Sequence, residues 1–139
     1  MAPEKVKVLL VDDEPDLTRN LALVLGRRGF EVDCVGDGLA ALSYVANKQY
    51  DVVVLDIKMP GMSGLGVLSE IKRFAPSIRV ILLTGHFSPT DEEDTLKSGA
   101  YAYLLKPFPI MKLVEVITAA AQGGKMPGLD RSTGPSMSD

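Results

Sequence analysis

The segment that most constrains the fold is residues 51–61, with the sequence DVVVLDIKMPG. Its uninterrupted apolar run, residues 52–55, is typical of a strand buried on both faces, as in a parallel sheet. The run ends at Asp56, and Pro60 and Gly61 then mark a loop. Asp56 is therefore expected at the carboxyl edge of a sheet, where ligands bind in open α/β folds. Because a lone carboxylate after a strand is usually only a solvated loop residue, a functional role needs support from the rest of the chain.

The chain alternates strand-like and helix-like patterns along most of its length. Short apolar runs rich in β-branched residues predict strands, and the segments between them carry apolar residues at helical spacing. The predicted strands are residues 6–11, 30–35, 51–56, 79–84 and 101–105. The predicted helices run from Pro15 to about Gly29, from Asp37 to about Lys48, from Ser63 to just before Pro76, from Ser88 to about Gly99, and from Pro109 onward.

Five strands that alternate with five helices predict a parallel sheet with helices on both faces. Right-handed crossovers favour a flavodoxin-like, doubly wound sheet of order 2-1-3-4-5, with the strands numbered along the chain. In that order, four neighbouring strands bring polar side chains to one edge of the sheet. These side chains belong to Asp12 and Asp13, Asp56, Thr84 and Lys106.

Two expectations concern side-chain burial. Cys34 is the single cysteine and cannot form an internal disulfide. Because it lies in an apolar strand pattern, it is expected to be a small buried residue. In the helix after Ser63, an inward-facing stripe is expected to contain Leu65, Leu68 and Ile71.

Length and charge set further bounds. A chain of 139 residues is expected to form one domain, here residues 5–122, and the Gly-, Pro- and Ser-rich residues 123–139 are expected to be a disordered tail or a truncated linker. A net charge of −3 disfavours direct nucleic-acid binding. No apolar run reaches membrane-spanning length and residues 1–7 lack a signal-peptide pattern, so a cytoplasmic protein with no membrane contact is expected.

The converging side chains indicate phosphoryl chemistry. Crowded carboxylates repel one another unless a cation lies among them, and oxygen ligands favour Mg²⁺. Zinc is disfavoured, because the neighbourhood offers no cysteine and only His86. A metal ion, a lysine and a hydroxyl can together neutralise and bind a tetrahedral dianion. Aspartate can accept a phosphoryl group as an acyl phosphate, in a reaction that needs mainly positioning and charge neutralisation.

These residues resemble a response-regulator receiver domain of two-component signalling. The resemblance covers about residues 5–121 and rests on the type, order and element of separated motifs: Asp12–Asp13, Asp56 in LDIKMPGMSG, Thr84–Gly85 and Lys106–Pro107–Phe108. It implies that Asp56 is the phospho-acceptor and that Thr84 and Lys106 contact the phosphoryl oxygens. It implies a Mg²⁺ site built from Asp13, Asp56 and the Lys58 backbone carbonyl, with Asp12 completing the acidic pocket. It also implies a cis peptide bond at Lys106–Pro107.

The resemblance further implies a switch and its partners. Phosphorylation by a sensor histidine kinase or a phosphotransfer protein would draw in Thr84 and turn Tyr103 inward. This would change the surface formed by residues 88–99, the strand 101–105 and the last helix, through which the chain could also form a phosphorylation-dependent homodimer. The simpler interpretation of Tyr103 is a strand aromatic packed against the last helix. The Lys58 side chain could shield the phosphoryl group from water.

Other classes of protein fit less well. An aspartate-nucleophile phosphohydrolase places its nucleophile in a DxD motif after the first strand, whereas Asp12 and Asp13 are adjacent and no residues remain for a cap domain. A flavodoxin-like cofactor binder needs a phosphate-binding loop there, and the acidic sequence DDEPD would repel a phosphate. A degenerate receiver that acts only as an interaction module is disfavoured by the intact acidic set. The sequence therefore favours a phosphorylation-activated switch over a turnover enzyme.

Overall fold

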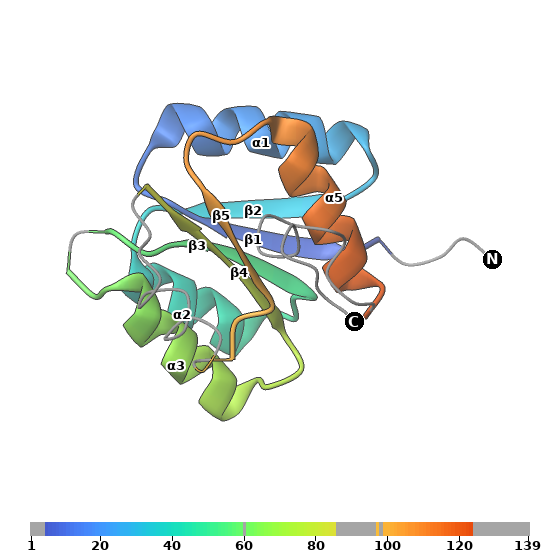
Figure 1. The fold of residues 1–139 in the computed structure, drawn as a ribbon. Helices are drawn as coiled ribbons and strands as arrows, with labels where there is room; N and C mark the ends of the chain where they lie inside the picture. Colours follow the sequence, from blue (N-terminus) through green and yellow to red (C-terminus); the bar gives the residue numbers. More distant parts are fainter. Residues whose placement is uncertain (1–4, 60, 86–96, 98, 124–139) are drawn as a thin grey trace, which may run out of the picture.

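The chain forms a five-stranded sheet with helices on both faces (Figure 1). The structure is a computed structural model, and it describes residues 5–59, 61–85, 97 and 99–123. The strands are β1 (Lys7–Val11), β2 (Glu31–Val35), β3 (Val52–Asp56), β4 (Arg79–Thr84) and β5 (Ala102–Leu105). The helices are α1 (Pro15–Arg27), α2 (Gly38–Asn47), α3 (Gly64–Phe74) and α5 (Ile110–Ala121).

All neighbouring strands are parallel, in the order β2-β1-β3-β4-β5. The predicted flavodoxin-like order 2-1-3-4-5 is therefore confirmed. Four of the five expected helices are present. Asp37 and Ser63, at which two of the helices were expected to begin, are the N-cap residues of α2 and α3, and their side chains accept hydrogen bonds from the amides of Ala40 and Gly66. The helix expected from Ser88 to about Gly99 lies almost wholly outside the described residues, as do residues 124–139.

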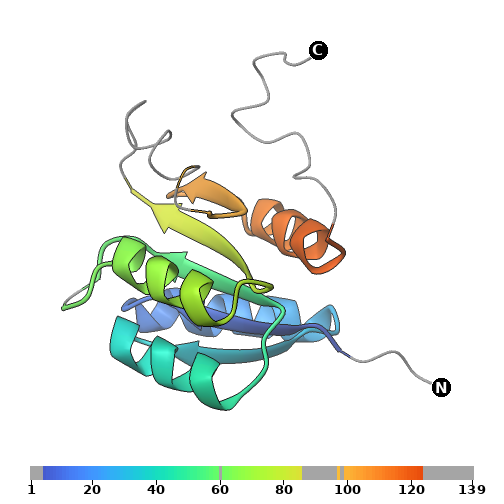
Figure 2. The ribbon, with the colours of Figure 1, turned by 90° about the horizontal axis from the view of Figure 1, so that it is seen from below.

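Alternating side chains of the central strands build a separate hydrophobic core on each face of the sheet. One core joins the sheet to α1 and α5, and the other joins it to α2 and α3, which lie side by side across the opposite face (Figure 2). In β3, for example, Val54 belongs to the first core and Val53 and Leu55 to the second. Since β1, β3 and β4 are buried on both faces, their polar residues are confined to the strand ends.

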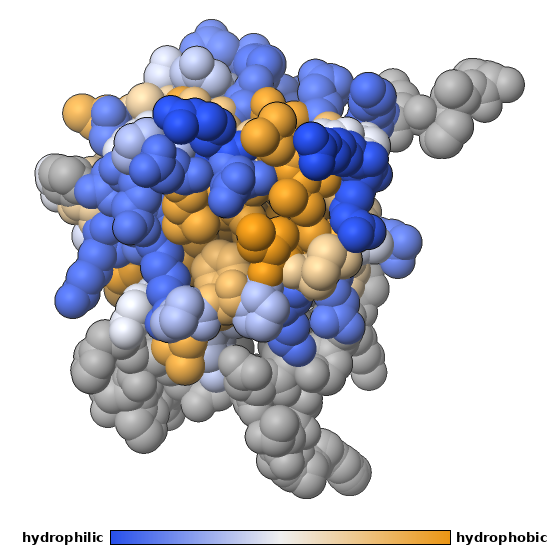
Figure 3. All heavy atoms as spheres, turned by 90° about the horizontal axis from the view of Figure 1, so that it is seen from above, coloured by the Kyte–Doolittle hydropathy of each residue, from blue (hydrophilic) through white to orange (hydrophobic). Residues whose placement is uncertain are grey.

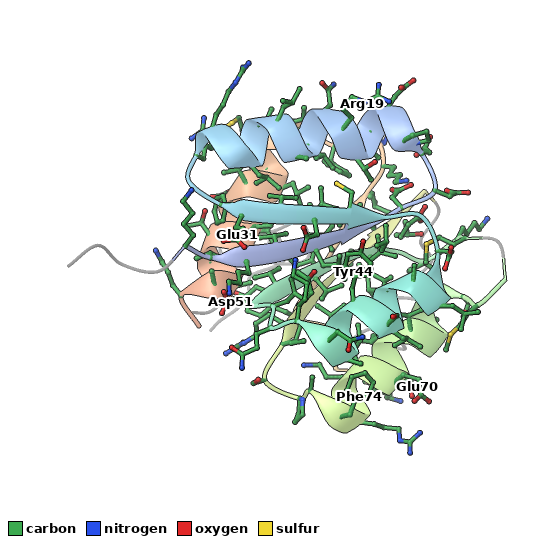
Figure 4. The ribbon with its side chains drawn as sticks, turned by 180° about the vertical axis from the view of Figure 1, so that it is seen from behind. Arg19, Glu31, Tyr44, Asp51, Glu70 and Phe74 are labelled. Carbon is green, nitrogen blue, oxygen red and sulfur yellow. The ribbon has the colours of Figure 1, made fainter. Side chains whose placement is uncertain are left out.

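Two of the burial predictions were wrong. Cys34 is exposed, because β2 is an edge strand with only one neighbouring strand (Figure 4 shows this edge, with Glu31 labelled). Leu65 is also exposed, whereas Leu68 and Ile71 are buried as predicted, in a stripe of α3 that also contains Gly64 and Val67. Leu65 follows Gly64 by one position, which turns its side chain by about 100° away from the sheet.

The start of α3 packs directly on the end of β3, just where Asp56 is located. The amide of Gly64 donates to the carbonyl of Ile57 over 2.9 Å. A methyl group at Gly64 would lie 2.6 Å from the Cα of Ile57 and still closer to the carbonyl oxygen of Asp56. Only a residue without a side chain allows this approach, so Gly64 fixes the distance between α3 and the Asp56 backbone.

We predict that Gly64→Ala lowers the free energy of unfolding by about 1–3 kcal/mol, because the added methyl group forces the backbone of β3 and α3 apart. Gly66→Ala is the matched control in the same helix turn, since a methyl group there meets the flexible Met62 side chain at 3.4 Å and the Ser63 hydroxyl at 3.6 Å, and no backbone atom outside its own helix closer than these. That variant should be neutral or more stable by roughly 0.5–1 kcal/mol through helix propensity. Urea unfolding of both variants tests this, and an equal loss of stability would contradict the proposed close packing.

Candidate functional site

The carboxyl edge of the sheet brings together the polar residues predicted to meet there. Asp12 and Asp13 follow β1, Asp56 and Thr84 end β3 and β4, and Lys106 follows β5. Asp12, Asp56 and Thr84 are buried, with exposed fractions of 4%, 6% and 2%. Carboxylate oxygens from Asp12, Asp13 and Asp56 lie within 4.8 Å of one another, and Asp13 is exposed. The three carboxylates thus form one cluster that is open to solvent on the Asp13 side.

The Lys106 ammonium group lies among carboxylates from separate parts of the chain. Its Nζ is 2.9 Å from Oδ2 of Asp12 and 3.3 Å from Oδ2 of Asp56. A further contact of 2.9 Å joins Nζ to Oε1 of Glu14. A lysine ammonium has three N–H donors, so these contacts use its full donor capacity.

Sequence reasoning missed Glu14 as a member of this site. The residue directly follows Asp13 and precedes the proline that opens α1, so it can be taken for an acid that only favours the helix N-terminus. Its contact with Lys106 spans 92 positions in the chain. The adjacency of a third acid to Asp12–Asp13 was the available signal, because it extends the same loop at the same edge of the sheet.

Backbone hydrogen bonds hold the two buried carboxylates in place. The amide of Lys58 donates to Oδ1 of Asp56 over 3.1 Å, and the amide of Glu14 donates to Oδ1 of Asp12 over 3.0 Å. Each carboxylate therefore has one oxygen fixed by its own loop and the other directed at Lys106. The backbone of Lys106 is also anchored, since its amide donates to the Thr84 carbonyl over 2.7 Å. The predicted cis peptide bond at Lys106–Pro107 is present.

Burial and charge shift the proton affinity of the central pair. Burial raises the pKa of Asp56 above its ordinary value, and the nearby charge of Asp12 adds to this, although Lys106 and the Lys58 amide act in the opposite direction. Burial would lower the pKa of Lys106, but its hydrogen bonds with Asp12 and Glu14 and the charge of Asp56 raise it overall. Lys106 is therefore a permanent cation at this edge, and the Asp56 carboxylate is relatively easy to protonate.

Tyr103 does not face the last helix, α5, against which the simpler interpretation of the sequence placed it. It is buried in the hydrophobic core that contains α2 and α3, with 7% of its surface exposed, whereas the residues of α5 belong to the other core. Packing of Tyr103 against the last helix was thus a wrong expectation.

His86 lies outside the described residues.

An apolar groove opens beside Lys106. It has a volume of about 410 Å³ and is lined by Glu14, Leu17, Lys106, Pro107, Phe108 and Ile110. Figure 3 shows hydrophobic side chains gathered on this side of the molecule, the side of the sheet that α1 and α5 cover. The charged edge of the sheet therefore borders a surface that favours contact with another apolar surface.

Comparison with known sequences assigns the chain to a family. The sequence model of the response regulator receiver domain matches residues 8–118. The chain belongs to the response regulator receiver domain family. It is therefore a signalling domain of two-component systems, as the motifs predicted.

Curated relatives of this receiver domain are longer proteins. The transcriptional regulatory protein ZraR of Klebsiella oxytoca is 39% identical over 120 residues, which cover 86% of this chain and 27% of that protein. The transcriptional regulatory protein TcrA of Mycobacterium tuberculosis is 38% identical over 122 residues, which cover 88% of this chain and 48% of that protein. The receiver domain thus spans half or less of the length of these relatives.

Solved structures share the fold of this receiver domain. A CheY-like response regulator receiver domain protein from Methanospirillum hungatei superposes with a TM-score of 0.83 at 27% identity, covering 86% of this chain and 96% of that one. A receiver domain protein from Clostridium thermocellum gives a TM-score of 0.78 at 35% identity, with coverage of 85% and 95%. Among the described residues of this receiver domain, none of the helices is long and apolar enough to cross a membrane.

The acidic cluster of this receiver domain could hold a metal ion. It offers only oxygen ligands, from Asp12, Asp13 and Asp56, and these suit Mg²⁺ far better than zinc. The exposed side of the cluster, at Asp13, leaves room for the water ligands that Mg²⁺ retains. The donor set and its spacing are therefore compatible with the ion that receiver domains generally bind.

We predict that Asp56→Asn raises the free energy of unfolding at neutral pH in metal-free buffer. Because folding raises the pKa of Asp56, the folded chain binds more protons than the unfolded chain between the two pKa values. The stability of the native chain therefore falls as pH rises through that window, and the asparagine variant avoids this loss.

Urea unfolding of both proteins across the acidic and neutral range tests the sign, and the difference should shrink as pH falls toward 3.8, the ordinary pKa of the carboxyl group. Asp33→Asn is a control of opposite sign, because hydrogen bonds from Lys48 and Tyr50 lower the pKa of Asp33. Removing that carboxylate should destabilise the fold at neutral pH. Parallel stability curves for native and Asp56→Asn protein would contradict the prediction.

Proposed function

We propose that this receiver domain accepts a phosphoryl group on Asp56 from a sensor histidine kinase or a phosphotransfer protein, in a Mg²⁺-dependent reaction. The observation that carries this proposal is the arrangement around the Asp56 carboxylate. That carboxylate lies 3.3 Å from the Lys106 ammonium group and within 4.8 Å of the carboxylates of Asp12 and Asp13. The adjacent apolar groove gives a partner protein a surface on which to dock.

The reaction follows from the chemistry of these groups. A carboxylate oxygen of Asp56 attacks the phosphorus, the P–N bond of the phosphohistidine breaks, and the imidazole nitrogen keeps the electron pair. Lys106 and the Thr84 hydroxyl bind oxygens of the transferred group. A Mg²⁺ ion held by Asp12, Asp13, Asp56 and the Lys58 carbonyl supplies further positive charge when bound. Later attack of water on the phosphorus releases phosphate and restores the Asp56 carboxylate.

The phosphorylated state would act through the surface that Thr84 and Tyr103 border. Thr84 ends β4, and Tyr103 sits on the neighbouring strand β5 in register with Leu82. Movement of the Thr84 hydroxyl toward the new phosphoryl oxygens would change the packing next to Tyr103, and with it residues 88–99, β5 and α5. Binding of a second copy of the chain or of an output partner at this surface would follow phosphorylation.

Two other functions are weaker. A phosphohydrolase needs a substrate pocket at its nucleophile, whereas the described part of the chain is a receiver fold whose apolar groove is lined by Lys106 and not by Asp56. A degenerate receiver would act without phosphorylation, but the acidic cluster and its lysine are both present here. A Mg²⁺ titration separates these cases, because a degenerate pocket has no reason to bind the ion.

We predict that incubation with acetyl phosphate and Mg²⁺ adds one phosphoryl group to the native chain and none to Asp56→Asn. Acetyl phosphate supplies the group directly, so the test needs no cognate kinase. Mass spectrometry of the intact chain is the measurement, and omission of Mg²⁺ should abolish the gain. An equal gain in both proteins would exclude Asp56 as the acceptor, and no gain in a native chain that binds no Mg²⁺ would favour the degenerate receiver.

We also predict that Lys58→Ala shortens the lifetime of the phosphorylated chain roughly twofold to fivefold, because an exposed lysine contributes modestly to holding an anion. The backbone amide of Lys58 donates a hydrogen bond to the Asp56 carboxylate. The exposed side chain of Lys58 therefore begins beside the acceptor and can shield the phosphoryl group from water. The decay of the phosphorylated mass over time gives the lifetime. Lys112→Ala is the control, since that ammonium faces Glu115 on α5 at 3.9 Å. An unchanged lifetime in Lys58→Ala would exclude this role.

A further inference from the structure

The Lys106 ammonium group has three carboxylate neighbours with very different surroundings. The side chains of Asp12 and Asp56 are buried, with exposed fractions of 3% and 8%, whereas that of Glu14 is 61% exposed. Yet Glu14 is as close to Nζ as Asp12 is, at 2.9 Å, and closer than Asp56 at 3.3 Å. An exposed glutamate therefore binds the cation that faces the acceptor carboxylate.

The backbone of Glu14 is held so that its side chain is directed at Lys106. Its amide donates to Asp12 over 3.0 Å, and its carbonyl accepts from the backbone amide of Thr18 over 3.1 Å. Pro15 restricts the preceding residue to an extended backbone, and Glu14 has φ −100° and ψ 99°. Glu14 is thus the fixed N-cap residue of α1, and its contact with Lys106 does not depend on a flexible loop.

We infer that Glu14 is a positioning residue that holds Lys106 in the resting state and competes with the phosphoryl group for it. This inference rests on the proposed function. All three N–H donors of Lys106 have partners, so before the transfer to Asp56 an incoming phosphoryl oxygen can bind Lys106 only if a carboxylate leaves. Glu14 leaves most readily, because its carboxylate returns to water, whereas Asp12 would remain buried and unpaired.

Repulsion adds to this competition. A phosphoryl oxygen in contact with Lys106 would share a single cation with the Glu14 carboxylate, and two like charges at that distance disfavour each other. Glu14 therefore slows capture of the phosphoryl group and favours the unphosphorylated state. The residue sets the threshold of the switch without itself touching the acceptor.

Phosphorylation of Glu14→Gln by acetyl phosphate and Mg²⁺ tests this inference. The amide keeps the shape of the side chain and removes its charge, so the rate of phosphorylation should rise roughly twofold to fivefold, the range of a partly exposed ion pair. Asp16→Asn is the matched control, because it removes a charge from the same helix turn. Asp16 is 96% exposed and pairs with Arg19, so its rate should stay close to that of the native chain.

A second measurement follows the contact itself. The ¹H–¹⁵N NMR signal of the Lys106 ammonium group, assigned by its loss in Lys106→Arg, should be resolved in the native chain, because bound N–H groups exchange slowly with water. We expect this signal to shift or broaden in Glu14→Gln and to stay unchanged in Asp16→Asn. A purely structural role of Glu14 would not alter the Lys106 signal selectively.

The outcomes are distinct. A faster reaction and an altered ammonium signal in Glu14→Gln alone support the competition. An equal or slower reaction in Glu14→Gln, the same increase in Asp16→Asn, or an unchanged Lys106 signal would each overturn it. If the native chain gains no phosphoryl group and binds no Mg²⁺, the proposed function fails by itself, and the ammonium signal still decides whether Glu14 holds Lys106.

Discussion

The contact between Lys106 and the buried carboxylates of Asp12 and Asp56 is the interaction on which the carboxyl edge of this sheet depends. These carboxylates lie at the carboxyl ends of the neighbouring strands β1 and β3, and they would repel each other without a cation between them. Lys106 arrives from the far side of β4, so the ammonium group also ties the loop after β5 to the ends of β1 and β3. The site exists only where the parallel register is correct, which couples the chemistry of the edge to the topology of the sheet.

The double-sided core explains why this edge is the place for chemistry. The residues of β3 are buried on both faces, so the strand has no free surface for a polar group except at its end. Asp56 occupies that position, and burial raises the pKa of its carboxyl group because the charged form is less well solvated there. Gly64 brings α3 against the same backbone, so the acceptor is held by packing from one side and by Lys106 from the other.

The sequence predicted most of this arrangement because its signals were continuous and local. Uninterrupted apolar runs located the strands, and the polar residue after each run located the edge of the sheet. What it failed to predict depended on position in the folded sheet. Cys34 is exposed because β2 is at the edge of the sheet. Tyr103 faces α2 and α3, because the alternation along a strand shows which residues share a face but not which helices cover that face. Glu14 contacts a lysine distant in sequence, and its own neighbours suggest only a helix start.

The unequal burial of the carboxylates around Lys106 determines how this site can rearrange. A group that leaves the ammonium must find other partners, and only an exposed carboxylate finds them in water at little cost. Glu14 alone meets this condition, since Asp12 and Asp56 are nearly enclosed. Glu14 is also the N-cap residue of α1 and lines the apolar groove beside Lys106. A change of partner at Lys106 therefore reaches the surface at the start of α1, beside that groove.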